Sequence, residues 1–338
     1  MNKPSNLTQL NSKPEKISDW DKLVEYNDKH NNKPDEFWIF RGQKESNWGL
    51  QSSLERAIAE ILGVPKKSKE PEKNDPEYSK KYDDYITDYN NYITKLRTAL
   101  KRDFGDVKKK KNIYELEFGL LREFQRKCSH HVTDLPKQNH IIEWFALMQH
   151  HGAPTRLLDW TYSFFIATYF ALKEAEGDCA VWALNVRWIK DIVETIIGKK
   201  KRDIYEEDEN FLKRTTFKKI FLEDPNAMVL AINPYHLNKR LTVQQGIFLC
   251  PGNISEPFED NLQGILSPTP NFQVDLIKYT IKYEIKAEIL KKLHRMNINE
   301  ASLYPGLDGF ARSLKTILWT FPNILEPGIF KEELKMLI

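Results

Sequence analysis

The sequence predicts an α+β protein, in which a mixed or antiparallel sheet is flanked by helices. Helical patterns dominate the first half of the chain, and strand patterns dominate the second half. Segregation of this kind is typical of α+β folds. The chain has 338 residues, of which 41% are apolar, so it is long enough to bury a large core. A polar, partly helical insertion is expected at 64–112.

The N-terminal third begins with a polar segment, residues 1–33, that contains one short helix at 18–26. Ser18 is the expected N-cap of this helix because a serine hydroxyl can accept a bond from a free backbone N–H. The mostly apolar string FWIFRG at 37–42 predicts a strand that ends in a glycine turn. A helix is expected to follow at 50–62.

The insertion at 64–112 is rich in Lys, Glu, Asp and Pro, and it holds too few aliphatic residues to define its own core. Part of it has helical spacing of its apolar and aromatic residues, namely Tyr85, Tyr89, Ile93 and Leu96. The run KKKK at 108–111 reads as a solvated loop or, alternatively, as a phosphate-binding patch.

The rest of the chain supplies the main helices and strands. Helices are predicted at 113–128, 141–152, 162–175, 286–296 and 310–320. Strands are predicted at 179–186, 227–234, 242–250 and 276–285. The segment 153–161 is expected to be a loop, and residues 321–338 a C-terminal tail.

Composition predicts a cytoplasmic protein with no membrane span. No stretch reaches the ~20 apolar residues of a transmembrane helix, and the first residues lack the apolar middle of a signal peptide. The three cysteines are far apart, which excludes a disulfide scaffold and a CxxC metal site. The net charge of +3, from 51 basic and 48 acidic residues, is too balanced for a dedicated nucleic-acid binder.

The most unusual string is LMQHHGAPTRLLDWT, which places polar residues between two apolar helices. Polar groups drawn into an interior need hydrogen-bond partners, and Arg156 and Asp159 are the obvious candidates for a mutual pair. One interpretation is that the pair lines a pocket. The other is that it only braces the loop, with Thr161 capping the next helix.

Arg41 and Gly42 form a second candidate site, at the end of an apolar strand. A guanidinium there could bind a phosphate or carboxylate through two parallel bonds, and the glycine would let a ligand approach the backbone. Alternatively, Arg41 pairs with an interior carboxylate.

Gln244 and Gln245 form a third candidate, in the predicted strand at 242–250. Consecutive strand residues point to opposite faces, so one of the two amides should be sheltered. An amide both donates and accepts hydrogen bonds and can therefore bind the edge of a base. A plain polar residue of a mixed sheet is the alternative.

Several other sites are not predicted. Adjacent histidines, as in His150–His151, do not face one point on a helix, so no metal site is expected. The GxSxG, P-loop and GxGxxG motifs do not occur. Cys128 has no evident orienting partner and is not expected to be a nucleophile.

Three segments together resemble the FRG domain, which is named for a Phe-Arg-Gly motif. They are FWIFRGQ (37–43), QHHGAPTRLLDWTYSFFIATYFAL (149–172) and SLYPGLDGFARSL (302–314). The resemblance places an FRG domain at 34–320. It implies a bacterial or phage-associated cytoplasmic domain of unassigned biochemistry, found in defence settings.

The order of elements is also similar to that of ADP-ribosyltransferases. In that plan Arg41 is the early strand-borne residue, Thr161 with Ser163 leads into an apolar helix, and Gln244–Gln245 occupies the late strand. The family has a glutamate at the last place, and a neutral amide cannot stabilise the charge that forms as nicotinamide leaves NAD. Asp159 or another carboxylate would have to replace it.

The preferred hypothesis is a pocket for NAD or another nucleotide. Its ligand-binding residues would be Arg41, Gly42, His150, Arg156, Thr161 and Gln245. Asp159 and His151 would be the catalytic residues, although the sequence leaves open whether the protein is an enzyme. The alternative is a non-catalytic module that recognises nucleic acid or a phage protein through 64–112. A third reading makes the polar motif a core that only fixes the fold.

Overall fold

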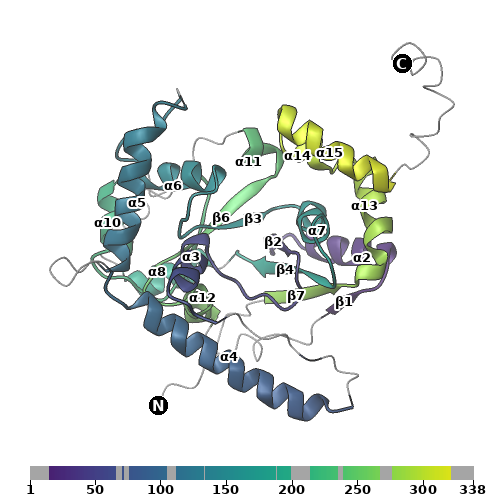
Figure 1. Cartoon of the computed structure of the whole chain (residues 1–338), viewed down its shortest axis with the longest axis horizontal. Coiled ribbons are helices and arrows are strands. Elements are labelled where there is room, and N and C mark those ends of the chain that lie inside the picture. Colours follow the sequence, from purple (N-terminus) through teal and green to yellow (C-terminus); the bar gives the residue numbers. More distant parts are fainter. Residues whose placement is uncertain are drawn as a thin grey trace.

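The computed structural model describes residues 15–65, 71, 76–104, 112–132, 134–187, 189–198, 214–234, 239–266 and 276–320. These residues form a seven-stranded sheet with the strand order β1-β7-β4-β2-β3-β6-β5, covered by helices (Figure 1). The predicted α+β class is confirmed. The KKKK run at 108–111 and the tail at 321–338 lie outside the described residues.

The strands are β1 (Glu15–Ile17), β2 (Trp38–Gln43), β3 (Leu158–Thr161), β4 (Cys179–Asn185), β5 (Val229–Ile232), β6 (Gly246–Pro251) and β7 (Leu276–Ile281). β1 is parallel to β7, and the other neighbours are antiparallel, so the sheet is mixed. β2 pairs with β4 along its whole length but with β3 only at Phe40 and Thr161. The sheet is therefore weakly joined between β2 and β3.

The helices of the first half are α2 (Trp20–Asn31), α3 (Ser53–Ile61), α4 (Tyr78–Leu100), α5 (Ile113–Cys128), α6 (Ile141–His150) and α7 (Phe164–Leu172). Those of the second half are α8 (Ile189–Ile197), α10 (Arg214–Phe221), α11 (Lys239–Val243), α12 (Phe258–Leu266), α13 (Lys286–Arg295), α14 (Glu300–Leu303) and α15 (Leu307–Thr320), with a short 3₁₀ turn at Tyr283–Ile285. The sequence did not predict β1, α8, α10, α11, α12 or α14.

The sheet separates two hydrophobic cores. Trp182 and Leu184 of β4 point into one core, which α5, α6, α8, α10 and α12 complete. Val181 and Ala183 point into the other, which α2, α7, α13 and α14 complete. Because successive strand residues face opposite sides, β4 is buried on both faces along its whole length.

A third, smaller core joins the predicted insertion to the body. Leu96 and Leu100 of α4 pack with Leu54 and Ile58 of α3 and with Ile113, the first residue of α5. The residues predicted to share one helical face, from Tyr85 to Leu96, are all buried. In Figure 1, α4 runs along the lower edge of the molecule, outside the sheet.

Three details of the sequence prediction are wrong. Asp19 rather than Ser18 caps α2, because its carboxylate accepts the Lys22 N–H at 2.8 Å. The expected loop at 153–161 ends in β3, a strand of the sheet interior. The strand predicted at 242–250 begins only at Gly246, since the residues before it form α11 and a turn.

The cap of α7 also differs from the prediction. Ser163 accepts the Ile166 N–H, whereas the Thr161 hydroxyl donates to the carbonyl of Gln244 at 2.7 Å. Gly152, as predicted, follows the end of α6 with a φ of +80°, a conformation that favours glycine. Among the described helices, none combines the length and the apolar character that crossing a membrane requires.

Candidate functional site

The three residues that follow Phe40 in β2 have three different environments. The Arg41 side chain lies at a pocket, Gly42 packs against α7, and Gln43 holds the next loop. A Cβ on Gly42 would lie 2.0 Å from the carbonyl oxygen of Ala167. The glycine is therefore required for the close approach of α7, which is a different reason from the ligand contact predicted for it.

The pocket lies beyond the end of β2 and has a volume of about 1080 Å³. Its walls come from β2, the loop at 44–51, α3, α4, α7 and the start of α12. Helix α4 thus contributes one wall, through Tyr89, Tyr92 and Ile93. This volume suits a ligand of nucleotide size.

Arg41 is the charged residue of β2 at this pocket. Its Nη1 donates to the backbone carbonyl of Asp159 at 2.6 Å, and its buried Nε has no hydrogen-bond partner among the described residues. No described carboxylate lies within ion-pair distance of the guanidinium. Burial lowers the pKa of Arg41 to about 10, and the nearby charge of Arg56 adds to the effect, while Asp159 opposes it.

Gln43 fixes the loop that forms the pocket wall. Its amide is 5% exposed, accepts the indole N–H of Trp182 at 2.8 Å and donates to the carbonyl of Gly49 at 2.8 Å. Gly49 in turn leaves room for the carboxylate of Glu259, which would lie 2.2 Å from a Cβ at this position. The loop is thereby held between the sheet and α12.

Two buried carboxylates, Glu55 of α3 and Glu259 of α12, line the same pocket. Glu55 accepts bonds from the N–H of Phe258 at 3.1 Å and from the amide of Gln51 at 3.2 Å. Glu259 accepts the N–H of Leu50 at 3.0 Å and a short bond from the hydroxyl of Tyr89. Burial raises the pKa of Glu55 to about 8, and the charge of Glu259 adds to the rise.

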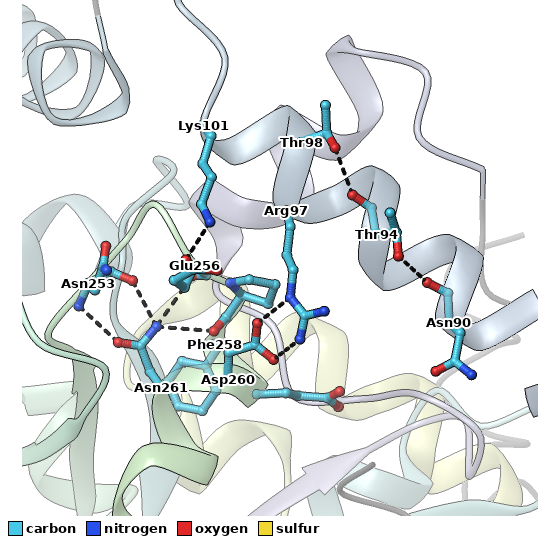
Figure 2. Close-up of polar contacts among 12 residues, drawn as sticks. Asn90, Thr94, Arg97, Thr98, Lys101, Asn253, Glu256, Phe258, Asp260 and Asn261 are labelled. Atoms are coloured by element: carbon cyan, nitrogen blue, oxygen red, sulfur yellow. Dashed lines mark hydrogen bonds and ion pairs between the residues drawn. The ribbon is translucent and has the colours of Figure 1, made fainter. Parts of the chain in front are cut away.

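Ion pairs hold α4 against α12 beside the pocket (Figure 2). Arg97 donates to both oxygens of Asp260, at 2.7 and 2.9 Å, and Lys101 pairs with Glu256 at 2.6 Å. Asn261 ties the same turn together through bonds to the carbonyls of Asn253 and Pro257. The wall that α4 provides is therefore anchored by a bidentate pair.

Arg156 does not lie at the pocket. It is fully buried in the core between the sheet and α5, where it forms a two-bond ion pair with Glu117. Its guanidinium lies 5.1 Å from the ring of Phe217 and 5.5 Å from that of Phe221. The predicted pair of Arg156 with Asp159 is wrong, because Glu117 is the partner.

Asp159 belongs to a polar network that supports the start of α3. Its exposed carboxylate accepts the amide N–H of Gln149 at 2.8 Å. The side-chain oxygen of Gln149 accepts hydrogen bonds from the hydroxyls of Thr155, at 2.6 Å, and Ser53, at 3.2 Å. Since Ser53 is the first residue of α3, this network positions the helix that carries Glu55 and Arg56.

A family model for the FRG domain matches residues 88–179. The chain contains an FRG domain. The match begins within α4, spans α5, α6, β3 and α7, and includes the string QHHGAPTRLLDWT. The FRG string at 40–42 and the segment at 302–314 lie outside the matched residues. No curated protein and no solved structure matches the chain.

Four other predicted site residues lie around β3 and α11 and do not line the pocket. The rings of His150 and His151, at the end of α6, meet edge-to-face with their centroids 4.8 Å apart. The pKa of His150 is lowered by burial and by the nearby charges of Arg240 and His151. The hydroxyl of Thr161 is bound to Gln244. Gln245 lies in the turn before β6 with a φ of +47°, not in a strand. Of the predicted residues, only Arg41 and Gly42 line the pocket.

The described part of the FRG-domain chain contains no group of three His, Cys, Asp or Glu side chains that could hold a metal ion. All three cysteines are buried, and burial raises the pKa of Cys179 and Cys250 to about 12. These two thiols are therefore protonated at neutral pH.

Sequence reasoning missed three buried glutamates, Glu55, Glu117 and Glu259, although each had a signal. Glu117 lies four residues from both Ile113 and Leu121, and so on the buried face of α5. Glu55 lies three residues before Ile58, and Glu259 three before Leu262. A carboxylate at an apolar position of a helical pattern indicates a buried acid.

Proposed function

We propose that this protein binds a nucleotide in the pocket at the end of β2. The proposal rests on the surroundings of the Arg41 guanidinium. A guanidinium at a pocket wall, with one backbone bond, no described carboxylate partner and a second guanidinium nearby, is an anion site. A phosphate would bind the free N–H groups and relieve the repulsion between Arg41 and Arg56.

The rest of the lining suits the remainder of a nucleotide. Trp48 and Tyr92 offer aromatic faces, and Lys44 lies 5.7 Å above the Trp48 ring. Aromatic side chains stack on bases, and basic side chains bind phosphates. NAD is the first nucleotide to test because the order of elements along the sequence is similar to that of ADP-ribosyltransferases, in which Arg41 takes the early strand position. Thr161 and Gln245, the other residues of that comparison, do not line the pocket.

Binding is tested by calorimetry and thermal shift with NAD, AMP, ADP and GMP on the purified chain and on Arg41→Ala. We expect at least one nucleotide to raise the melting temperature, and Arg41→Ala to weaken its binding at least tenfold because one charge-assisted contact is lost. Chromatography of the NAD sample reports whether nicotinamide is released.

Arg126→Ala is the matched control, since Arg126 lies on α5, is 65% exposed and pairs with Glu123. It should bind like the unmodified chain. Equal binding by the chain and by Arg41→Ala, or no stabilisation by any nucleotide of the set, would overturn the proposal.

The alternative, recognition of a nucleic acid or a protein through 64–112, has no specific feature of the described residues in its favour. Arg97 and Lys101, two basic residues of this segment, are used in ion pairs with the body of the protein. A nucleic-acid complex would show steep weakening with salt.

A further inference from the structure

The pocket lining contains a pair of arginines and a pair of glutamates, named here the basic end and the acidic end after their charges. Arg41 and Arg56 form the basic end. Glu55 and Glu259, which are only 5% and 7% exposed, form the acidic end. Among the described residues, no Lys, Arg or His nitrogen lies within ion-pair distance of either carboxylate. The two carboxyl groups thus have hydrogen bonds but no ion pair among the described residues.

These hydrogen bonds leave acceptor positions on the carboxyl oxygens free for a ligand. A carboxylate offers about four lone-pair positions, and each oxygen of Glu55 accepts one N–H, at 3.1 or 3.2 Å. Buried carboxylates without a cation are costly, and structures normally pair them. The buried pair lowers this cost while Glu55 holds a proton. A ligand that brings a positive charge to this wall would let both carboxyl groups ionise.

We propose that the ligand is a nucleotide with a cationic base, whose phosphate binds Arg41 and Arg56 and whose base lies against Glu55 and Glu259. This inference rests on the proposed nucleotide function and adds the charge of the base to it. The oxidised nicotinamide ring of NAD is such a base, whereas the reduced ring of NADH has nearly the same shape and no charge.

Binding of a cationic base should release a proton from the acidic end. The ionisable groups that act on Glu55 are Glu259 of α12 and Tyr92 of α4. Tyr89 of α4 donates to Glu259, and Arg56 of α3 lies near Tyr92. At neutral pH the empty pocket holds a proton on Glu55. A bound cation stabilises the ionised carboxylate, so this proton passes to the buffer.

The test compares NAD⁺ with NADH by calorimetry on the intact chain, in two buffers that differ in ionisation enthalpy. We expect NAD⁺ to bind at least tenfold more tightly than NADH. We also expect a fraction of a proton to be released at pH 7 with NAD⁺ and none with NADH. This measurement needs no variant and is therefore independent of any effect on folding.

Glu55→Gln should bring the NAD⁺ and NADH affinities together and abolish proton release, whereas Glu123→Gln, on the outer surface of α5, should change neither. Equal binding of NAD⁺ and NADH by the unmodified chain would overturn the inference and leave the nucleotide function standing. The same holds if AMP or ADP binds and neither nicotinamide nucleotide does. If no nucleotide binds, both proposals fail.

Discussion

At the scale of single residues, the ion pair between Arg156 and Glu117 shows how this chain buries charge. Both side chains are inaccessible to solvent, and aromatic rings surround the guanidinium. The string around Arg156 correctly suggested a polar group drawn into the interior. Its partner lies 39 residues away in the sequence, so local spacing favoured Asp159, and only the packing of α5 on the sheet reveals Glu117.

Removal of Glu117 should therefore be far more damaging than removal of the Asp159 charge. Glu117→Ala leaves Arg156 buried without a counter-charge and should lower the free energy of unfolding by about 3–5 kcal/mol. Asp159→Asn should cost less than about 1 kcal/mol, because the new amide oxygen can still accept the Gln149 N–H. Urea denaturation of the two variants measures the difference.

A double variant, Glu117→Leu with Arg156→Met, provides the control. It removes both charges and should regain much of the lost stability, since apolar residues of similar volume can replace a buried pair. A larger loss for Asp159→Asn than for Glu117→Ala would contradict the assignment of the partner.

At the scale of elements, the long and strongly patterned segments were predictable and the short ones were not. The helices at α5, α6 and α13 follow from apolar spacing alone. β3 has only four residues, and its pairing with β6 gives it its structure. The residues before β6 have strand-like composition, but the left-handed conformation of Gln245 ends α11 there. Tertiary contacts thus decided the short elements.

The packing of α7 on β2 depends on Gly42. Gly42→Ala should destabilise the fold by about 1–3 kcal/mol, because the new methyl group would overlap the backbone of Ala167 and Ala171. Gly119→Ala, on α5 with open space around it, is the control and should be neutral or slightly stabilising. Thermal unfolding checks both, and equal effects would show that the α7 contact is not required.

The ion pair that holds α4 against α12 should also affect the pocket. Arg97→Ala removes a bidentate, partly buried pair with Asp260 and should cost about 1–2 kcal/mol. We expect faster hydrogen exchange along α4 and weaker ligand binding, because α4 forms one wall of the pocket. Lys95→Ala changes an exposed residue of the same helix and should affect neither. Unchanged exchange in Arg97→Ala would show that the pair does not anchor α4.

At the scale of the whole molecule, the candidate site could be predicted only in part. Arg41 and Gly42 were found because a polar motif at the end of an apolar strand is visible in one short string. The opposite wall comes from α3, α4 and α12, which lie far apart in the sequence and meet only in the folded chain. No spacing rule connects Glu55 with Glu259. They come together because Glu55 of α3 accepts the N–H of Phe258, the first residue of α12.

The same buried groups should set the pH dependence of global stability. Burial lowers the pKa of His30 from 6.5 to about 4, so its contribution to stability grows as the pH rises through this range. The pKa of Glu55 is raised from 4.5 to about 8, so the folded state binds the extra proton and its contribution declines as the pH rises between these values. The two effects on stability oppose each other between about pH 4.5 and 6.5. Of these two groups, only Glu55 changes the stability between about pH 6.5 and 8.

The free energy of unfolding should therefore fall from pH 6.5 to 8, with a slope of at most about 1.4 kcal/mol per pH unit, which is the limit for one proton. Urea denaturation at half-unit pH steps measures this slope. Glu55→Gln cannot titrate, so its profile should be flat over the same range even if the variant is less stable overall. A slope that persists in Glu55→Gln would assign the titration to another group and would remove the buried acid from the pocket's chemistry.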